Sequence, residues 1–399
     1  MALLRRRGRL VGFGFVMAFA SSFGQTYFIG VFGPSVQTEF GLSHTGWGSV
    51  YLVGTLASAA VLPWSGKLLD RVPLRQYATA VALLLAAACA STSLIAGVVT
   101  LAIAIFLLRQ AGQGLASHVA VTSMARYFGR ERGRAIAIAA LGFAAGEAVL
   151  PVAAVAAIAA FGWRTTYGGI AVIVLIMLLP AIAILLRRPP AIASDDRDDK
   201  LDAPASYTRG QVLRDPRFYL IVPGIVCPAL VVTALFFHHL NLADAKGWSH
   251  AWITGNYVVF AGTGAVVTLL CGPLIDRIGA VRLVPAMLLP MVAALVMVAA
   301  FDHALIVWAY LGLLGISIGI AHTAITAMWA EIYGIAHLGA IRAMITAIAV
   351  FASALGPVAL GVLMDSGLAI ERALLVFAAY ASGATVLLFV ALARRGARP

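Results

Sequence analysis

The chain has 399 residues, of which 62% are hydrophobic and only 11% are charged. Soluble domains average about 45–50% apolar and about 25% charged residues, so this composition excludes a soluble protein and indicates a polytopic membrane protein. Cys89, Cys227 and Cys271 stand singly in apolar segments, without metal-ligand spacing. We therefore expect neither a disulfide framework nor a metal site, and no cofactor.

Apolar runs long enough to cross about 30 Å of hydrocarbon follow one another along the chain. The first follows four arginines but is too long for the apolar part of a secretory signal. Six runs lie near 10–32, 47–65, 77–97, 98–124, 135–160 and 165–186, and six more lie near 218–240, 251–273, 281–301, 303–329, 341–364 and 372–393. The only long polar stretch separates the two sets, is rich in charge and proline, and predicts a solvated linker.

These runs predict an all-α membrane protein, because only helices and closed barrels satisfy the backbone in lipid. We expect twelve transmembrane helices in two halves. The N-terminal six-helix half covers 1–187, the cytoplasmic linker covers 188–217, and the C-terminal six-helix half covers 218–399.

Nearly all of the 28 Lys and Arg residues lie in the connections between predicted spans. Arg164, Lys246 and Arg372 fall in one set of alternating connections, Arg109 falls inside a span, and all the others fall in the opposite set. The positive-inside rule explains this pattern, so the net charge of +12 reports topology and does not indicate a nucleic-acid partner. Both termini are expected in the cytoplasm, and the membrane is expected to be a bacterial cytoplasmic (inner) membrane.

A charged turn between the second and third spans, over 66–71, recurs 206 positions later over 272–277. The offset is close to half of the chain and holds far from this turn. The pairs that keep it are Gly66 and Gly272, Leu68 and Leu274, Asp70 and Asp276, Arg71 and Arg277, Tyr127 and Tyr333, Gly133 and Gly339, and Pro151 and Pro357. The sequence therefore predicts an internal repeat, in which two copies of one helical bundle follow each other, as in many transporters.

The first copy of this turn resembles the signature loop of the major facilitator superfamily of secondary transporters. Gly66, Asp70, Arg71 and Arg75 match that pattern, whereas Pro73 stands where glycine is usual. Leu74 stands where a basic residue is usual. The resemblance covers nearly the whole chain and implies two pseudo-symmetric six-helix bundles that work by alternating access. It implies a transporter and not an enzyme.

The two charged turns are predicted to form a cytoplasmic gate. The alternative is that their charges only set the orientation of the spans in the membrane. Asp70 lies where the next helix is expected to begin, so its carboxylate is expected to accept from free N–H groups there. The predicted gate residues are Gly66, Asp70, Arg71, Arg75, Gly272, Asp276 and Arg277. The predicted partners across the halves are Gly339 and Arg342 for Asp70, and Gly133 and Arg134 for Asp276.

Two charged residues, Arg109 and Glu147, lie inside predicted spans, where a charge costs about 2.5–3.5 kcal/mol or more. Arg109 with Gln113 resembles a span-four motif of the superfamily that is associated with proton coupling, but with a spacing one residue longer. Arg109 is therefore either a substrate or proton-coupling residue or a structural hydrogen-bond hub. Glu147 is either the protonatable group or a permanent partner that neutralises Arg109.

Other polar residues inside spans complete the predicted substrate or proton-coupling set. They are Gln25, Tyr27, His239, Asn256, Tyr257 and His322. Histidine titrates near neutral pH, but a lone membrane histidine is as often a packing residue. Glycines in spans five and eleven, including Gly142, Gly146 and Gly356, are interpreted as close-packing positions without substrate contact.

Residues 24–27, 237–239 and 329–334 resemble bacterial transporters of the monocarboxylate and oxalate–formate type. This implies a small organic anion as substrate, Arg109 as its charge partner and protons as the coupled ion, in a monomer within the lipid bilayer. Span eight lacks the arginine and span one lacks the lysine that such carriers use. The main alternative is a proton-driven exporter of drug-like or amphipathic compounds, and a receptor or scaffold on this fold is a further alternative.

Overall fold

The computed structural model describes residues 2–187 and 207–393, and these residues are almost entirely helical. Eleven of its helices are long and apolar enough to cross a membrane, and a twelfth span results if one bent pair is counted together. The fold is therefore the predicted twelve-span all-α bundle. The predicted linker lies outside the described residues over 188–206.

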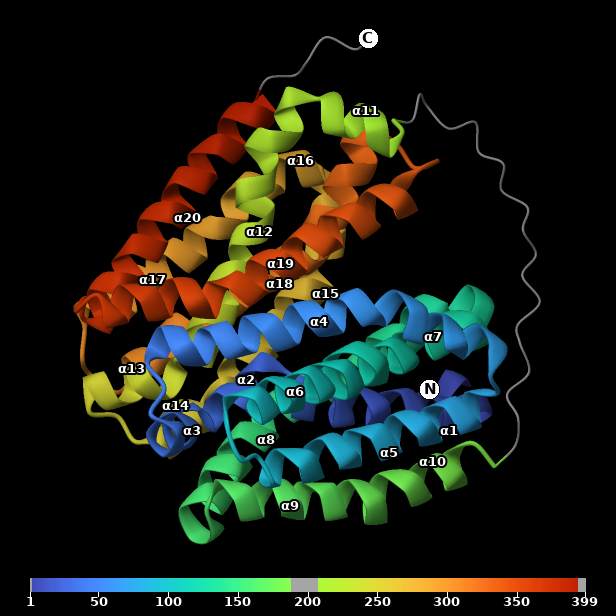
Figure 1. The fold of residues 1–399 in the computed structure, drawn as a ribbon. Helices are drawn as coiled ribbons and strands as arrows, with labels where there is room; N and C mark the ends of the chain where they lie inside the picture. Colours follow the sequence, from blue (N-terminus) through green and yellow to red (C-terminus); the bar gives the residue numbers. More distant parts are fainter. Residues whose placement is uncertain (1, 188–206, 394–399) are drawn as a thin grey trace. The chain divides into compact units, whose positions relative to one another are not determined.

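The first ten helices belong to the N-terminal half (Figure 1). They are α1 (Ala2–Ala20), α2 (Thr26–Val31), α3 (Gly33–Phe40), α4 (His44–Arg71), α5 (Leu74–Ser93), α6 (Val98–Leu108), α7 (Ser117–Phe128), α8 (Arg132–Phe161), α9 (Trp163–Ile173) and α10 (Leu179–Leu185). The segments Arg109–Ala116 and Val174–Leu178 are π-helical and join α6 to α7 and α9 to α10. Each joined pair forms one long span.

The remaining helices of the described residues begin at Arg209, inside the predicted linker. They are α11 (Arg209–Arg214), α12 (Pro216–Phe237), α13 (His239–Lys246), α14 (His250–Gly255), α15 (Tyr257–Ile278), α16 (Ala280–Leu283), α17 (Leu289–Ala300), α18 (Ile306–Tyr333), α19 (Leu338–Asp365) and α20 (Ile370–Ala393). Part of the predicted linker is thus a short helix, α11, which begins at a Thr208–Gln211 capping box. Asp215 caps α12 by accepting from the Arg217 backbone nitrogen.

The helices form two compact units. Unit 1 consists of Met1–Arg197 together with Ser249–Val258, and unit 2 consists of Asp198–Trp248 together with Val259–Pro399. The first unit therefore includes α14 and the first residues of α15, and α14 packs against α8. The bounds of the two halves and of the linker stay a prediction.

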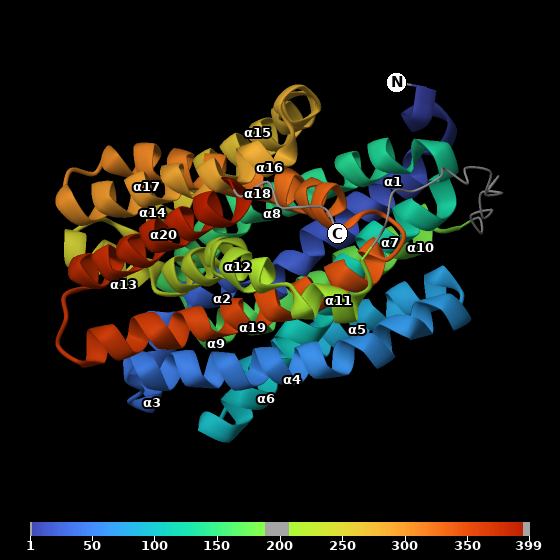
Figure 2. The same cartoon turned by 90° about the horizontal axis from the view of Figure 1, so that it is seen from above.

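Corresponding helices pair in the same way within each unit. In unit 1, α1 packs on α8 and α5 packs on α9, and in unit 2, α12 packs on α19 and α17 packs on α20 (Figure 1, Figure 2). Spans two and four pack through α4 and α6. Their counterparts in unit 2 approach closely, since a Cβ on Gly319 would lie 2.8 Å from the Gly264 carbonyl oxygen. The repeated pairings are the structural form of the sequence repeat.

The first span is broken, which the uniform apolar run over 10–32 does not reveal. Residue Gln25 is extended, with φ −83° and ψ 153°, and separates a 3-10 turn at Ser21–Gly24 from α2. The two parts, Gly8–Gly24 and Thr26–Phe40, meet at an angle of 47°. The span also continues eight residues beyond the predicted end at Phe32, because α3 begins at Gly33 and ends at Phe40.

Glycines let this broken span approach its neighbours closely. A Cβ on Gly112 would lie 2.6 Å from the backbone nitrogen of Gly24, so the turn before Gln25 rests directly on the π-helical segment. A Cβ on Gly142 would lie 2.2 Å from the Phe15 carbonyl oxygen, and α1 therefore also lies directly on α8. Small residues serve this purpose in membrane helices, as predicted for Gly142.

We expect Gly112→Ala to destabilise the protein by about 1–3 kcal/mol, because its methyl group would meet backbone atoms of Gly24 that cannot rotate away. The matched control is Gly169→Ala in α9, where no heavy atom lies within 4 Å of the added carbon. That change should be neutral or stabilising by up to about 1 kcal/mol. Thermal unfolding in detergent measures both, and equal shifts for the two variants would contradict the close contact.

Candidate functional site

Arg109 is buried in unit 1, with 1% of its surface exposed. Its Nη1 donates to the Gly24 carbonyl oxygen at 3.2 Å and to Thr26 Oγ1 at 3.4 Å. The guanidinium carbon also lies 5.2 Å from the centre of the Tyr51 ring, whose hydroxyl shares a hydrogen bond with Thr26. These partners are all neutral, and Arg109 Nε has no hydrogen-bond partner among the described residues.

The π-helical segment that begins at Arg109 explains the unusual motif spacing. A π-helix forms i→i+5 hydrogen bonds and so takes up more residues per turn than an α-helix, and such segments are frequent at functional sites. The one additional residue between Arg109 and Gly114 is accommodated in this wider turn. It also places Gly112 against Gly24, next to the carbonyl group that Arg109 binds.

The polar residues around Arg109 on this span face different neighbours. Gln110 is buried and joins the segment to α4, because it accepts from Ser58 at 3.0 Å and donates to Ser65 at 2.8 Å. Gln113 is half-buried and forms no hydrogen bond with another described residue. Gln110 is therefore a packing residue, and the amide of Gln113 has no hydrogen-bond partner among the described residues.

Glu147 lies on α8, directly after Gly146. It is half-buried. The Tyr27 hydroxyl donates to Ser22 Oγ at 2.8 Å, and Ser22 Oγ sits where a Cβ on Gly146 would be. The hydrogen bond of Tyr27 thus lies against the residue that precedes Glu147, and the roles of Tyr27, Glu147 and Tyr257 stay a prediction.

Arg109 and Glu147 form no ion pair with each other among the contacts of the described residues. The interpretation of Glu147 as a permanent neutralising partner of Arg109 is therefore wrong for this conformation. Two separate groups result, a cation with neutral partners and an acid beside phenols. Half-buried Gln25 lies between α1 and α2, at the break that joins the two groups.

The other predicted residues have different surroundings. Asn256 donates to the Trp252 carbonyl oxygen of its own helix at 2.7 Å. In unit 2, buried His239 shares a hydrogen bond with Tyr310, and its ring lies tilted against that of Phe236, so its contacts are those of a packing residue. His322 is exposed on α18 and forms no hydrogen bond with another described residue. Unit 2 does not bring His239 and His322 into one cluster.

The two charged turns differ in how they are built. Asp70 stays inside the last turn of α4 and pairs with Arg126 of α7 at 3.6 Å, and no side chain caps the start of α5. The predicted cap by Asp70 is therefore wrong. The pair is largely exposed, so it contributes at most about 1 kcal/mol.

The second turn has the cap that the first lacks. Glu331 at the end of α18 accepts from the backbone nitrogens of Ala280 and Val281, at 2.8 and 3.1 Å. Gly279 permits this arrangement with φ +81°, whereas Pro73, its counterpart at the same offset, has φ −54°. The acid that caps this turn therefore comes from α18, and not from Asp276 of the turn itself.

The remaining gate residues lie at these turns. Gly66 is buried, with room for a Cβ 3.6 Å from the His118 ring, and Arg71, Arg75 and Arg277 are exposed. Gly272 is half-buried and has open space around its Cα. The predicted partners of Asp70 and Asp276 belong in each case to the other unit, so the gate stays a prediction.

Thr26, Tyr51 and the Gly24 carbonyl group were missed as ligands of Arg109. Sequence periodicity places Tyr51 in the second span but gives no sign that its ring lies under a guanidinium. The broken helix that frees the Gly24 carbonyl has no proline to mark it. Only the polar run over 25–27, unusual in a span, pointed to this place.

The two units of repeated membrane helices, with a charged group held inside the bundle, define a polytopic membrane transporter. A family model of the Major Facilitator Superfamily matches residues 14–357. The chain belongs to this superfamily, as its signature turn predicts. It is a transporter and not an enzyme.

Solved structures agree with this fold. The chain is similar to a bacterial homologue of the human lysosomal transporter Spinster in an inward-facing, unoccupied conformation, with 15% identity, a TM-score of 0.72 and 97% of each chain covered. The inward-facing, occupied form of such a homologue matches with 16% identity and a TM-score of 0.68, over 96% of this chain and 94% of the other. No curated protein sequence matches the chain. The monocarboxylate and oxalate–formate resemblance stays a prediction.

We expect Arg109→Gln to leave the thermal stability of the substrate-free protein unchanged or to raise it. A charge at mid-membrane costs about 2.5–3.5 kcal/mol, and neutral partners compensate only part of that cost. The measurement is thermal unfolding in detergent without added organic anions, with Arg126→Gln as the control at the membrane surface. A loss of about 2 kcal/mol or more would instead identify Arg109 as a structural hydrogen-bond hub.

Proposed function

We propose that this transporter moves a small carboxylate together with protons, by alternating access, and that Arg109 binds the carboxylate group. The observation that carries the proposal is the environment of Arg109. It is buried, its hydrogen-bond partners are neutral, and no acidic side chain pairs with it among the described residues. A cation kept in this state favours an anionic ligand.

The chemistry of arginine supports a carboxylate in particular. A guanidinium presents donors in a planar fork that matches the two oxygens of a carboxylate. Thr26 and Gly24 use Nη1, while Nε is left without a partner. An anion that reached Nε would gain a charge-assisted hydrogen bond in surroundings from which water is largely excluded.

Glu147 is proposed as the proton-carrying group. It is half-buried on α8, it forms no ion pair with Arg109 among the described residues, and the hydrogen bond of Tyr27 to Ser22 lies against the neighbouring Gly146. A carboxyl group without an ion-pair partner inside the membrane is favoured in its neutral form, so its charge can follow the state of the transport cycle. Gln25 and Gln113 are proposed as further polar contacts for the substrate.

The distribution of basic residues supports an orientation with both termini in the cytoplasm, and we propose a bacterial inner membrane as the location and a monomer as the working form. The rival proposal is a proton-driven exporter of amphipathic compounds. Its support is the set of aromatic rings beside the charged groups, Tyr27, Tyr51 and Tyr257. The two proposals differ in the charge of the molecule that moves.

We expect a small carboxylate to drive proton movement in proteoliposomes that contain the wild type. Arg109→Gln should abolish it, because the anion loses its only charged partner. Glu147→Gln should uncouple it, so that the carboxylate moves without protons. Internal pH, followed with a trapped dye, and uptake of a labelled carboxylate give the two readouts.

The control is an equal amount of protein carrying Gln110→Leu, which changes a packing residue on the same span and should retain transport. The proposal fails if no carboxylate in a panel moves protons while lipophilic compounds do, and the exporter then replaces it. Unchanged carboxylate transport by Arg109→Gln would also refute it.

A further inference from the structure

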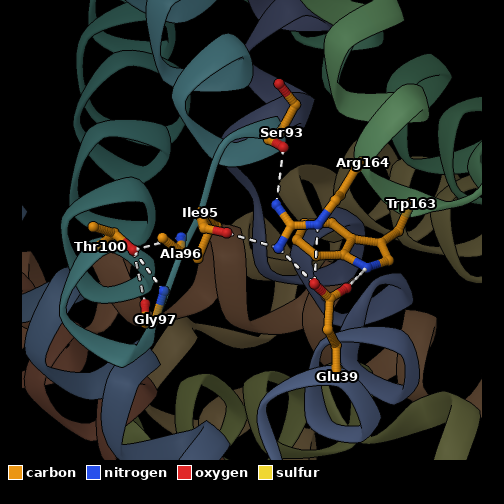
Figure 3. Close-up of polar contacts among 8 residues, drawn as sticks. All are labelled: Glu39, Ser93, Ile95, Ala96, Gly97, Thr100, Trp163 and Arg164. Carbon is orange, nitrogen blue, oxygen red and sulfur yellow. Dashed lines mark hydrogen bonds and ion pairs between the residues drawn. The ribbon is translucent and has the colours of Figure 1, made fainter.

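The outer end of unit 1, the end that the charge pattern predicts to face away from the cytoplasm, carries a compact ionic cluster (Figure 3). Glu39, in the last turn of α3, accepts from Arg164 Nη2 at 2.5 Å and Nε at 3.0 Å, and from Trp163 Nε1 at 2.7 Å. The Arg164 guanidinium lies 4.5 Å from the centre of the Trp163 ring. The two oxygens of the Glu39 carboxylate thus accept three hydrogen bonds from Trp163 and Arg164 of α9.

Arg164 also binds the end of α5. It donates to the carbonyl oxygens of Ser93 at 3.0 Å and Ile95 at 2.7 Å. These carbonyl groups lie at a helix C-terminus, where a positive charge is favoured. Arg164 therefore fixes α5 and α9 together, and Glu39 attaches the end of the first span to that fixed point (Figure 3).

The segment between the break and this cluster lies along α9. Phe28 and Phe32 of the first span pack on Tyr167, with ring centres 6.4 and 4.1 Å apart. Tyr167 follows Arg164 by three residues, so it lies on the same face of α9, one turn further along. The outer segment Thr26–Phe40 is therefore docked on α9 at its far end and in its middle.

The near end of the same segment carries ligands of the candidate site. Thr26 is its first residue and accepts from Arg109, and Tyr27 follows it and lies near Glu147. The extended residue Gln25 interrupts the helical hydrogen bonding on the other side. The position of Thr26 therefore depends on what holds the outer segment, as well as on the close Gly24–Gly112 contact that precedes it.

Unit 2 has an ion pair at the equivalent place, with the charges exchanged. Lys246 ends α13 and Glu371 begins α20, and their atoms lie 3.9 Å apart. Both residues stand 207 positions after Glu39 and Arg164. Lys246, whose side chain is 1% exposed, also binds Asp302 at 2.5 Å. This pair lies in unit 2. The basic residues of that unit stand only at span ends, so the pair has no intramembrane cation beside it.

We propose that Glu39 and Arg164 are positioning residues for the anion site: they fix the outer segment of the broken first span on α9, and thereby hold Thr26 against Arg109. The proposal rests on the proposed function, because it assigns the ligand site that the segment serves. Glu39 and Arg164 are 40% and 35% exposed, and exposed ion pairs add little stability. Their effect is expected on the position of the segment and not on the fold.

The test compares Glu39→Gln with Lys246→Gln. Glu39→Gln removes the charge that holds the outer segment, and Lys246→Gln breaks the equivalent pair in unit 2. In proteoliposomes, Glu39→Gln should raise the KM for the transported carboxylate about fivefold with little change in maximal rate, because the weakened contact is with the ligand site. Lys246→Gln should leave KM unchanged.

A second readout does not depend on transport. Amide hydrogen exchange over residues 26–40 should be faster in Glu39→Gln than in the wild type, and unchanged in Lys246→Gln. Wild-type KM and exchange in Glu39→Gln would overturn the proposal, as would equal KM changes in both variants. If the wild type moves no carboxylate, the proposed function fails, and the exchange of residues 26–40 still decides whether Glu39 anchors the segment.

Discussion

The backbone contact between Gly24 and Gly112 is the constraint on which the candidate site depends. It presses the broken part of the first span against the π-helical part of the fourth, and neither glycine has room for a side chain. At this crossing both helices depart from regular α-geometry, so backbone groups become available inside the membrane. Arg109, three residues before Gly112, donates to the free Gly24 carbonyl oxygen. Irregular backbone at this depth is tolerated where it is buried in protein, and transporters commonly bind substrates at such breaks.

The repeat gives both units the same helix pairings but only unit 1 an intramembrane charge. At the repeat offset from Arg109 stands Gly315, where a Cβ would lie 2.7 Å from the Phe260 carbonyl oxygen. Unit 2 therefore uses this position for close helix packing, whereas unit 1 uses it for a cation. Ser353 stands at the offset from Glu147. The two units of the duplicated fold have therefore diverged, since only unit 1 carries charged groups inside its spans. The outer ion pairs have diverged as well, because the acidic and basic positions are exchanged between Glu39–Arg164 and Lys246–Glu371.

Much of the fold could be predicted because membrane spans have a strong signal. Long apolar runs, the asymmetry of Lys and Arg, and the 206-residue repeat together predict the number and order of spans. The bounds of α8, predicted over 135–160, agree with Arg132–Phe161 to within a few residues. The break at Gln25 was not predictable in the same way, since no proline or glycine pair marks it and the apolar run continues through it. The one-residue excess after Arg109 was visible, but its cause is a hydrogen-bonding pattern that composition does not report.

The candidate site shows the same limit. Arg109 and Glu147 stand out because charge is rare in lipid. Whether the two charges pair could not be read from their spacing, because it depends on how α8 and the fourth span face each other. The Asp70 cap was wrong for a related reason. α4 continues past Asp70, so its carboxylate reaches Arg126 of α7 and not the start of α5.

The uncompensated cation at Arg109 is proposed to receive an organic anion. Thermal unfolding of the purified protein in detergent, with and without a panel of small carboxylates, tests this without requiring transport. A carboxylate that binds only the folded state stabilises it by about 2.7 kcal/mol at a hundred times its Kd. The account predicts this stabilisation for the wild type and its loss in Arg109→Gln. Equal stabilisation of both proteins by the same carboxylate would contradict it.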